Sequence, residues 1–177
     1  MPALPAFADR FGLSGAVITA VDLVAGLAKL IGFHRVDVPG ATGYVDTNYA
    51  GKGAAAAAAL DEYDLVFVHV EAPDEAGHND DVAGKVRAIA EIDRHIVGPL
   101  LDRLRAEAAG WRILVLPDHP TPCSIRTHTG DPVPFAMAGK GVIEAVVPGG
   151  FSEKTASSSD LHVARGHELM EYFLTVR

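Results

Sequence analysis

The segment Asp64-Leu-Val-Phe-Val-His-Val70 decides the fold, because it is the clearest predicted strand in the chain. Its nearly continuous apolar character predicts burial on both faces, as in a parallel sheet. Apolar residues at helical spacing precede and follow it, so strands and helices alternate along the sequence. We therefore expect an α/β fold, with a mostly parallel sheet, helices on both faces, and residues 1–177 in a single domain.

The remaining elements follow from the same periodicities and from turn residues. Residues 81–107 should form one long helix that Gly98-Pro99 kinks or divides. Residues 1–13 should form a connection with one short helical turn, and residues 139–160 a loop with a weak strand. The other predicted strands are residues 15–19, 35–38, 111–116 and 132–137, and the other predicted helices are residues 21–31, 54–60 and 166–174.

Composition excludes several classes of partner. The 177 residues carry a net charge of −8, so neither nucleic acid nor an anionic membrane surface is an expected partner. Cys123 is the single cysteine, which excludes an internal disulfide and fits a reducing compartment. No apolar run has the length of a membrane span, and no leader opens the chain. The expected location is the cytoplasm.

Two polar clusters follow predicted strands. Asp74 and His78 come after residues 64–70, whereas Asp118, His119 and then His128 come after residues 111–116. Ligands bind at the carboxyl ends of strands in open parallel sheets, and we expect these two strands to be neighbours. Taken singly, such an aspartate is usually a helix cap and such a histidine usually has satisfied hydrogen bonds. Together, their carboxylates and imidazoles predict a metal site, and two ions about 4 Å apart would polarise a phosphoryl group.

Other residues are weaker candidates. Lys52 and Arg126 could bind a substrate phosphate, but a solvated surface position is equally compatible with each. Glu71 and His69 could orient a metal ligand. Nucleophilic catalysis has no candidate, because Ser14, Ser124 and Cys123 lack a neighbouring base. The remaining histidines are expected on the surface, on helix faces or at a helix start: His34, His95, His162 and His167.

Several long motifs resemble one known family, the cofactor-independent (2,3-bisphosphoglycerate-independent) phosphoglycerate mutases of the archaeal-type branch, within the alkaline phosphatase superfamily. The resemblance covers nearly the whole chain. It is carried by Gly15-Ala-Val-Ile-Thr-Ala-Val-Asp-Leu23, Val38-Pro-Gly-Ala-Thr-Gly-Tyr-Val-Asp-Thr-Asn-Tyr49, Val68-His-Val-Glu-Ala-Pro-Asp-Glu-Ala-Gly-His78, Val115-Leu-Pro-Asp-His-Pro-Thr-Pro122 and Arg126-Thr-His-Thr-Gly-Asp-Pro-Val-Pro-Phe135.

This resemblance implies a glycolytic isomerase with an alkaline-phosphatase-like core. The family interconverts 3-phosphoglycerate and 2-phosphoglycerate through a phosphoserine intermediate. It uses two divalent ions, preferably manganese, with zinc, cobalt or magnesium as further possibilities. Carried over to this sequence, the resemblance implies that Asp74, His78 and His128 hold one ion, and that Asp118 and His119 contribute to the other.

The chain also departs from the family. Family members are much longer, and they open with a strand that bears a metal-binding aspartate, followed later by the serine nucleophile. We therefore expect this chain to be the carboxyl-terminal part of the catalytic domain, inactive without its amino-terminal half, which is then an expected partner. Exposed sheet edges would favour self-association. Two alternatives stay open: a metal-dependent phosphomonoester or phosphonate hydrolase of the same superfamily, and a non-catalytic remnant or binding module.

Overall fold

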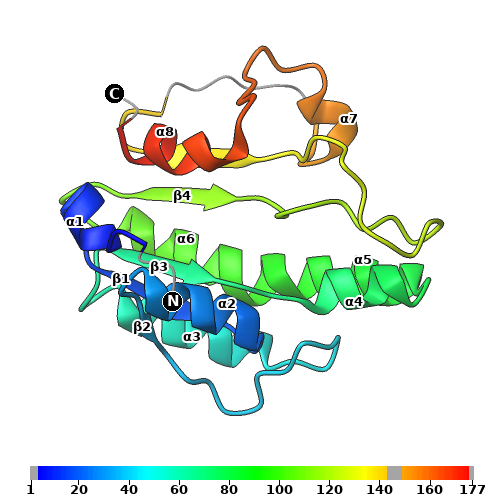
Figure 1. Cartoon of the computed structure of the whole chain (residues 1–177), viewed down its shortest axis with the longest axis horizontal. Coiled ribbons are helices and arrows are strands. Elements are labelled where there is room, and N and C mark those ends of the chain that lie inside the picture. The colour runs from blue at the N-terminus through cyan, green and yellow to red at the C-terminus, as the bar shows by residue number, and fades with distance from the viewer. Residues whose placement is uncertain (1–3, 143–148, 176–177) are drawn as a thin grey trace. The chain divides into compact units, whose positions relative to one another are not determined.

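The computed structural model describes residues 4–142 and 149–175. These residues divide into two compact units, each with its own sheet (Figure 1). The first unit is Met1–Arg103 together with Thr121–Thr127, and the second is Leu104–Pro120 together with His128–Arg177. In the described part of the chain, no helix combines the length and the apolar character that crossing a membrane requires.

The first unit contains a three-stranded parallel sheet. Strand β1 (Gly15–Ile18) lies in the centre, between β2 (His34–Arg35) and β3 (Leu65–Val68). Side chains of β1 form the centre of the core, since Val17 and Ile18 are at most 1% exposed. The prediction that β3 is buried on both faces is wrong, because β3 lies at an edge of this sheet and Phe67 is 44% exposed. The predicted α/β class with a parallel sheet is confirmed.

Helices make the connections between these strands. Helix α2 packs beside β2, and α3 packs against β1 and β3. The alanine-rich α3 also approaches the segment Asp93–Val97 closely, because a Cβ atom at Gly53 would lie 2.1 Å from the carbonyl oxygen of His95. The helices of this unit are α1 (Phe7–Phe11), α2 (Asp22–Leu30), α3 (Tyr49–Ala59), α4 (Ala72–His78), α5 (Val82–Ile92) and α6 (Gly98–Arg105), which ends just beyond it.

The predicted long helix is present but interrupted. A π-helical segment, Asp93–Val97, joins α5 to α6, so the irregularity begins before Gly98 rather than at it. Apolar side chains are buried in the second half of this helical segment but not in the first. Ile96 and Leu100 are less than a tenth exposed, whereas the α5 side chains Val82 and Val86 are more than half exposed.

The second unit contains a two-stranded sheet. Strand β4 (Arg112–Val115) pairs with β5 (Ala136–Gly139) in antiparallel orientation. The guanidinium of Arg112 donates to the carbonyl oxygens of Phe173 and Leu174 at 2.8 and 2.7 Å, which ties β4 to α8. In α8, Leu169 and Phe173 are buried and Met170 is half-buried. The helical elements are α7 (Glu153–Ala156), a 3-10 turn at Gly166–Glu168, and α8 (Leu169–Thr175).

Several predicted elements differ from the observed ones. Among the described strands, β3 pairs with β1 in the first unit and β4 pairs with β5 in the second, and the expectation that the strands before the two polar clusters are neighbours stays a prediction. The segment between β4 and β5 contains five prolines and no helix that could return the chain for parallel pairing. Residues 36–38 lie outside β2, and β5 starts four residues later than predicted. Residues 139–160 were expected to form a loop with a weak strand; residues 143–148 lie outside the described residues, and the described part contains the short helix α7.

Two hydrogen-bonded side chains join the starts of β1 and β3. The carboxylate of Asp64 accepts hydrogen bonds from the backbone N–H and the hydroxyl of Ser14, at 2.8 and 2.7 Å, while the Asp64 N–H donates to the same hydroxyl oxygen. The Ser14 bonds, led by its backbone N–H, hold the pKa of Asp64 below its ordinary value.

The Asp64 contact predicts a specific acid sensitivity. Because the pKa of Asp64 is lower in the folded state than in the unfolded state, its contribution is complete above the ordinary pKa of 3.8 and is lost as pH falls through the folded-state value. We expect Asp64→Asn to remove this part of the acid-induced loss of unfolding free energy. Urea denaturation from neutral to strongly acidic pH checks it. An unchanged pH dependence in both Asp64→Asn and Ser14→Ala would contradict it.

Lys52 is the most deeply buried charged residue described, at 0% exposed. Its ammonium donates to the carbonyl oxygen of His69 at 3.2 Å, which ties α3 to the chain just after β3. Burial lowers the pKa of Lys52, and the nearby carboxylate of Glu71 opposes that effect. The sequence left two alternatives for Lys52, and the one that placed it in solvent at the surface is therefore wrong.

Lys52 predicts a pH dependence of the same sign at alkaline pH. Its folded-state pKa lies below the ordinary 10.5, so the unfolded state binds more protons between the two values and stability rises with pH there. We expect the unfolding free energy of the wild type, relative to Lys52→Met, to increase as pH approaches 10.5. Urea denaturation at several alkaline pH values measures this difference. Lys29→Met, at an exposed position of α2, is the matched control and should show no such increase.

Candidate metal centre

Helix α4 presents the first two predicted ligands. Asp74 and His78 stand four residues apart, so they share one face of this helix, and His78 Nε2 lies 3.3 Å from Asp74 Oδ2. Proline at the start of α4 is compatible with a helix because the first N–H groups have no partner within it. Both side chains are half-buried, which reduces competition from water without closing the site to a ligand.

The segment Thr121–Thr127 packs on α4 within the first unit. A Cβ atom at Gly77 would lie 2.4 Å from the carbonyl oxygen of Thr121, so a larger residue would push the two apart. Lys85 Nζ donates to the same carbonyl oxygen at 2.6 Å. The buried hydroxyl of Thr121 donates to Asp74 Oδ1. Thr121 thereby fixes one carboxylate oxygen and leaves Oδ2 on the side of His78.

Hydrogen bonding defines the state of the His78 ring. Its Nδ1 lies 3.0 Å from the carbonyl oxygen of Arg126, and a carbonyl can only accept, so Nδ1 carries the hydrogen. In the neutral ring, Nε2 is then a lone-pair nitrogen that faces the carboxylate oxygen of Asp74. Two acceptors that converge in this way need a cation between them or a proton on the ring. The Asp74 carboxylate and the His78 imidazole therefore suit a metal ion as ligands.

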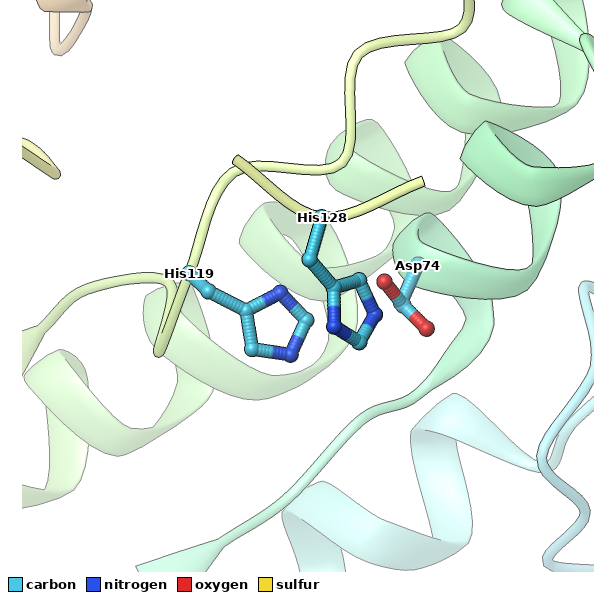
Figure 2. A group of neighbouring side chains, drawn as sticks. All are labelled: Asp74, His119 and His128. Carbon is cyan, nitrogen blue, oxygen red and sulfur yellow. The ribbon is translucent and has the colours of Figure 1, made fainter. Parts of the chain in front are cut away.

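The other three predicted ligands gather in the second unit, in the loop after β4. The rings of His119 and His128 have centroids 3.7 Å apart with planes inclined by 33°, and Figure 2 shows these two rings side by side. His119 Nε2 also lies 3.5 Å from an oxygen of the Asp118 carboxylate. A backbone hydrogen bond of 3.1 Å from Thr129 to Pro120 closes the loop that carries both histidines. Their adjacency follows from this closure.

A candidate group of metal ligands among the described residues comprises Asp74, His119 and His128, each of which can offer one ligand atom (Figure 2). Asp74 and His119 are half-buried, whereas His128 is exposed. Carboxylate oxygen together with imidazole nitrogen suits zinc, manganese and cobalt. All three belong to the five ligands predicted from the sequence; His78 contacts Asp74 and Asp118 contacts His119.

Other predicted site residues lie in a separate hydrogen-bonded network. His69 Nδ1 lies 3.2 Å from the Thr19 hydroxyl, and His69 Nε2 lies 3.3 Å from the Glu71 carboxylate. This network links the carboxyl ends of β1 and β3 to the residue before α4. His69 and Glu71 thus have contacts that can orient the start of the helix that bears Asp74. A substrate-binding role for the enclosed ammonium of Lys52 stays a prediction.

The residues judged unimportant for the site have structural contacts or lie in solvent. His34 stacks on Tyr63, and His95 contacts Glu91 one helical turn away. His162 and His167 are exposed, the latter in the 3-10 turn before α8. Ser14 is occupied by Asp64, and Cys123 is a half-buried free thiol.

Two contributors were missed from the sequence, Thr121 and Asp80. Thr121 lies between two prolines, a context that indicates a restricted backbone but not a contact with Asp74. Asp80 forms an ion pair with Arg126, whose carbonyl oxygen accepts from His78. Neither partner is close in sequence, so no local pattern could have revealed them.

Comparison with known proteins gives consistent results. The family described as the Metalloenzyme superfamily matches residues 1–175. A 2,3-bisphosphoglycerate-independent phosphoglycerate mutase from Methanothrix thermoacetophila is 50% identical over 98% of this chain and 44% of its own length. A second protein of that name, from Methanothermobacter thermautotrophicus, is 51% identical over 98% of this chain and 42% of its own. The chain thus spans less than half the length of these relatives.

Solved structures show the same fold. A protein from Pyrococcus horikoshii aligns with a TM-score of 0.90 and 34% identity, over 97% of this chain and 51% of that one. A cofactor-independent phosphoglycerate mutase from Thermoplasma acidophilum aligns with a TM-score of 0.71 and 25% identity, over 99% of this chain and 40% of that one. The resemblance to cofactor-independent phosphoglycerate mutases that the sequence motifs predicted is confirmed. With its family match extending over nearly every residue, this chain belongs to the Metalloenzyme superfamily.

Proposed function

We propose that this chain is the metal-binding part of a phosphoglycerate mutase, an isomerase of glycolysis that interconverts 3-phosphoglycerate and 2-phosphoglycerate through a phosphoserine intermediate. Relatives of that name align over 98% of the chain, which supports the substrate class. The carboxylate and imidazole donors support the use of divalent metal. The proposal further places the protein in the cytoplasm and the chain within one catalytic domain, as its carboxyl-terminal part.

The observation that carries the proposal is the short sequence separation between the second-unit ligands His119 and His128 and residues that contact the first-unit ligands Asp74 and His78. Thr121 donates to Asp74 within the first unit, and only Pro120 separates Thr121 from His119. The backbone carbonyl oxygen of Arg126 likewise accepts from His78, and only Thr127 separates Arg126 from His128. Consecutive Cα atoms are about 3.8 Å apart, so the chain itself keeps each histidine of the second set close to a residue that contacts the first.

The proposed roles of the side chains follow from their chemistry. Asp74, His78 and His128 would hold one divalent ion, and Asp118 and His119 would contribute to a second. Manganese is the preferred ion, with zinc, cobalt or magnesium as alternatives. Bound ions would supply charge that polarises a phosphoryl group and neutralises the phosphoglycerate substrate. Thr121 orients the carboxylate of Asp74, and the carbonyl of Arg126 holds the ring of His78.

Metal binding is the direct test of this assignment. We expect Asp74→Asn and His128→Ala each to weaken manganese binding by more than about tenfold, because even residues that only orient a ligand contribute that much. Asp74→Asn keeps an oxygen that can accept from Thr121, so its effect reports the lost charge. Titration calorimetry with Mn²⁺ on the chain measures the affinity.

His162→Ala provides the matched control, since His162 is also an exposed histidine and is not among the proposed ligands. Its affinity for manganese should equal that of the wild type. Unchanged affinity in both Asp74→Asn and His128→Ala would refute the proposed site.

The second expectation concerns turnover. We propose that the serine nucleophile, a further ligand of the second ion and the substrate-binding domain belong to an amino-terminal part of the parent enzyme. The chain alone should therefore bind metal and show no conversion of 3-phosphoglycerate to 2-phosphoglycerate, which a coupled enolase assay measures. Measurable conversion that His128→Ala abolishes would show that the nucleophile lies within these 177 residues.

That missing part would also be the principal partner of this chain. Strand β3 pairs on one side only in the described sheet, and Phe67 of that strand is exposed. An unpaired edge of this kind can accept a further strand or a second copy of the chain.

A further inference from the structure

Two residues near His78 have an unusual backbone conformation. Asp80 and Arg126 both have φ of 58°, and they are the only described non-glycine residues with positive φ. This left-handed region is unfavourable for residues with a Cβ atom, although Asp tolerates it better than Arg. The two strained residues are also partners: an Arg126 guanidinium nitrogen lies 2.5 Å from an Asp80 carboxylate oxygen.

Each strained residue terminates a short element. Asp80 follows the end of α4, where the N–H of Asp81 donates to Ala76 and that of Asp80 to Gly77. This is the position at which a helix usually ends with glycine. Arg126 ends the turn in which its own N–H and that of Ile125 both donate to the carbonyl of Pro122. The ion pair thus joins the end of α4 to the end of this turn.

The His78 imidazole lies between these two ends. His78 is the last residue of α4, and its Nδ1 donates to the carbonyl oxygen of Arg126 itself. The left-handed conformation of Arg126 sets the direction of that carbonyl, and the ion pair with Asp80 links the two left-handed residues. Because strained backbone persists only where its surroundings hold it, strain at this place indicates a functional constraint.

We propose that the Asp80–Arg126 ion pair is a positioning device that fixes the His78 ring with its hydrogen on Nδ1 and its Nε2 directed at the metal. This inference rests on the proposed metal-binding function. Asp80 and Arg126 are positioning residues, since neither need touch the ion. Hydrogen bonding of the distal ring nitrogen commonly fixes the tautomer of a metal-binding histidine.

Exposure separates this role from a contribution to stability. The side chains of Asp80 and Arg126 are 42% and 62% exposed, and exposed ion pairs contribute little to folding. Loss of the pair should therefore change the tautomer of His78 and the affinity for Mn²⁺, and should leave the urea concentration at the unfolding midpoint nearly unchanged. The dependence on Asp80 separates this role from the phosphate-binding role predicted for Arg126, because phosphate binding by Arg126 would not require Asp80.

The test uses the whole chain and two readouts. Nitrogen-15 NMR of the metal-free protein reports the tautomer of His78, and calorimetry with Mn²⁺ reports affinity. The variants are Asp80→Asn, which still tolerates the left-handed conformation but lacks the charge, and Arg126→Gln. The double variant Asp80→Arg with Arg126→Asp restores an ion pair of reversed polarity. Asp37→Asn, which removes the exposed pair with Arg35, is the control.

We expect both single variants to mix the two His78 tautomers and to weaken Mn²⁺ binding about tenfold, the lower end of what such orienting contacts contribute. The double variant should recover most of both, and Asp37→Asn should change neither. If His78 keeps its hydrogen on Nδ1 alone in both single variants, the inference is overturned, whatever the affinity of these variants for Mn²⁺. If the wild type binds no Mn²⁺, the proposed function fails, and the tautomer readout still decides whether the ion pair orients the ring.

Discussion

The site depends on the close packing of the segment Thr121–Thr127 against helix α4. That approach is possible because residue 77 is glycine; any Cβ atom there would collide with the carbonyl oxygen of Thr121. Packing brings the Thr121 hydroxyl to Asp74 and the Arg126 carbonyl to His78. A carboxylate and an imidazole that would otherwise move freely on a short helix are thereby directed at each other before any ion arrives. Such preorganisation lowers the free-energy cost of binding.

Local patterns in the sequence were sufficient for the parallel sheet of the first unit, but not for helix α4. Alternating strands and helices predicted a parallel sheet, and continuous apolar character located β1 and β3 to within a few residues. The polar clusters after two strands identified residues of the right chemistry, and the candidate ligands Asp74, His119 and His128 all lie in them. These features depend on residue type and spacing, which a single sequence displays directly.

Features that depend on contacts distant in sequence were not predictable in this way. The antiparallel pairing of β4 with β5 follows from a proline-rich connection, yet its length alone also permits a crossover. The burial of Lys52 depends on a carbonyl seventeen residues away, and the pairing of Asp80 with Arg126 joins positions forty-six residues apart. Positive φ at two ordinary side chains likewise has no local signal, because the surrounding contacts impose it.

The buried ammonium of Lys52 can report local unfolding of the first unit through its reaction with a labelling reagent. An amine-reactive reagent reaches a lysine only when the amine is accessible and deprotonated, and the Lys52 side chain is fully buried and bonded to the chain after β3. Its labelling therefore waits for the sheet and α3 to separate, whereas the exposed Lys29 reacts from the folded state. The ratio of the two labelling rates, followed by mass spectrometry, would measure how often this core opens without any denaturant.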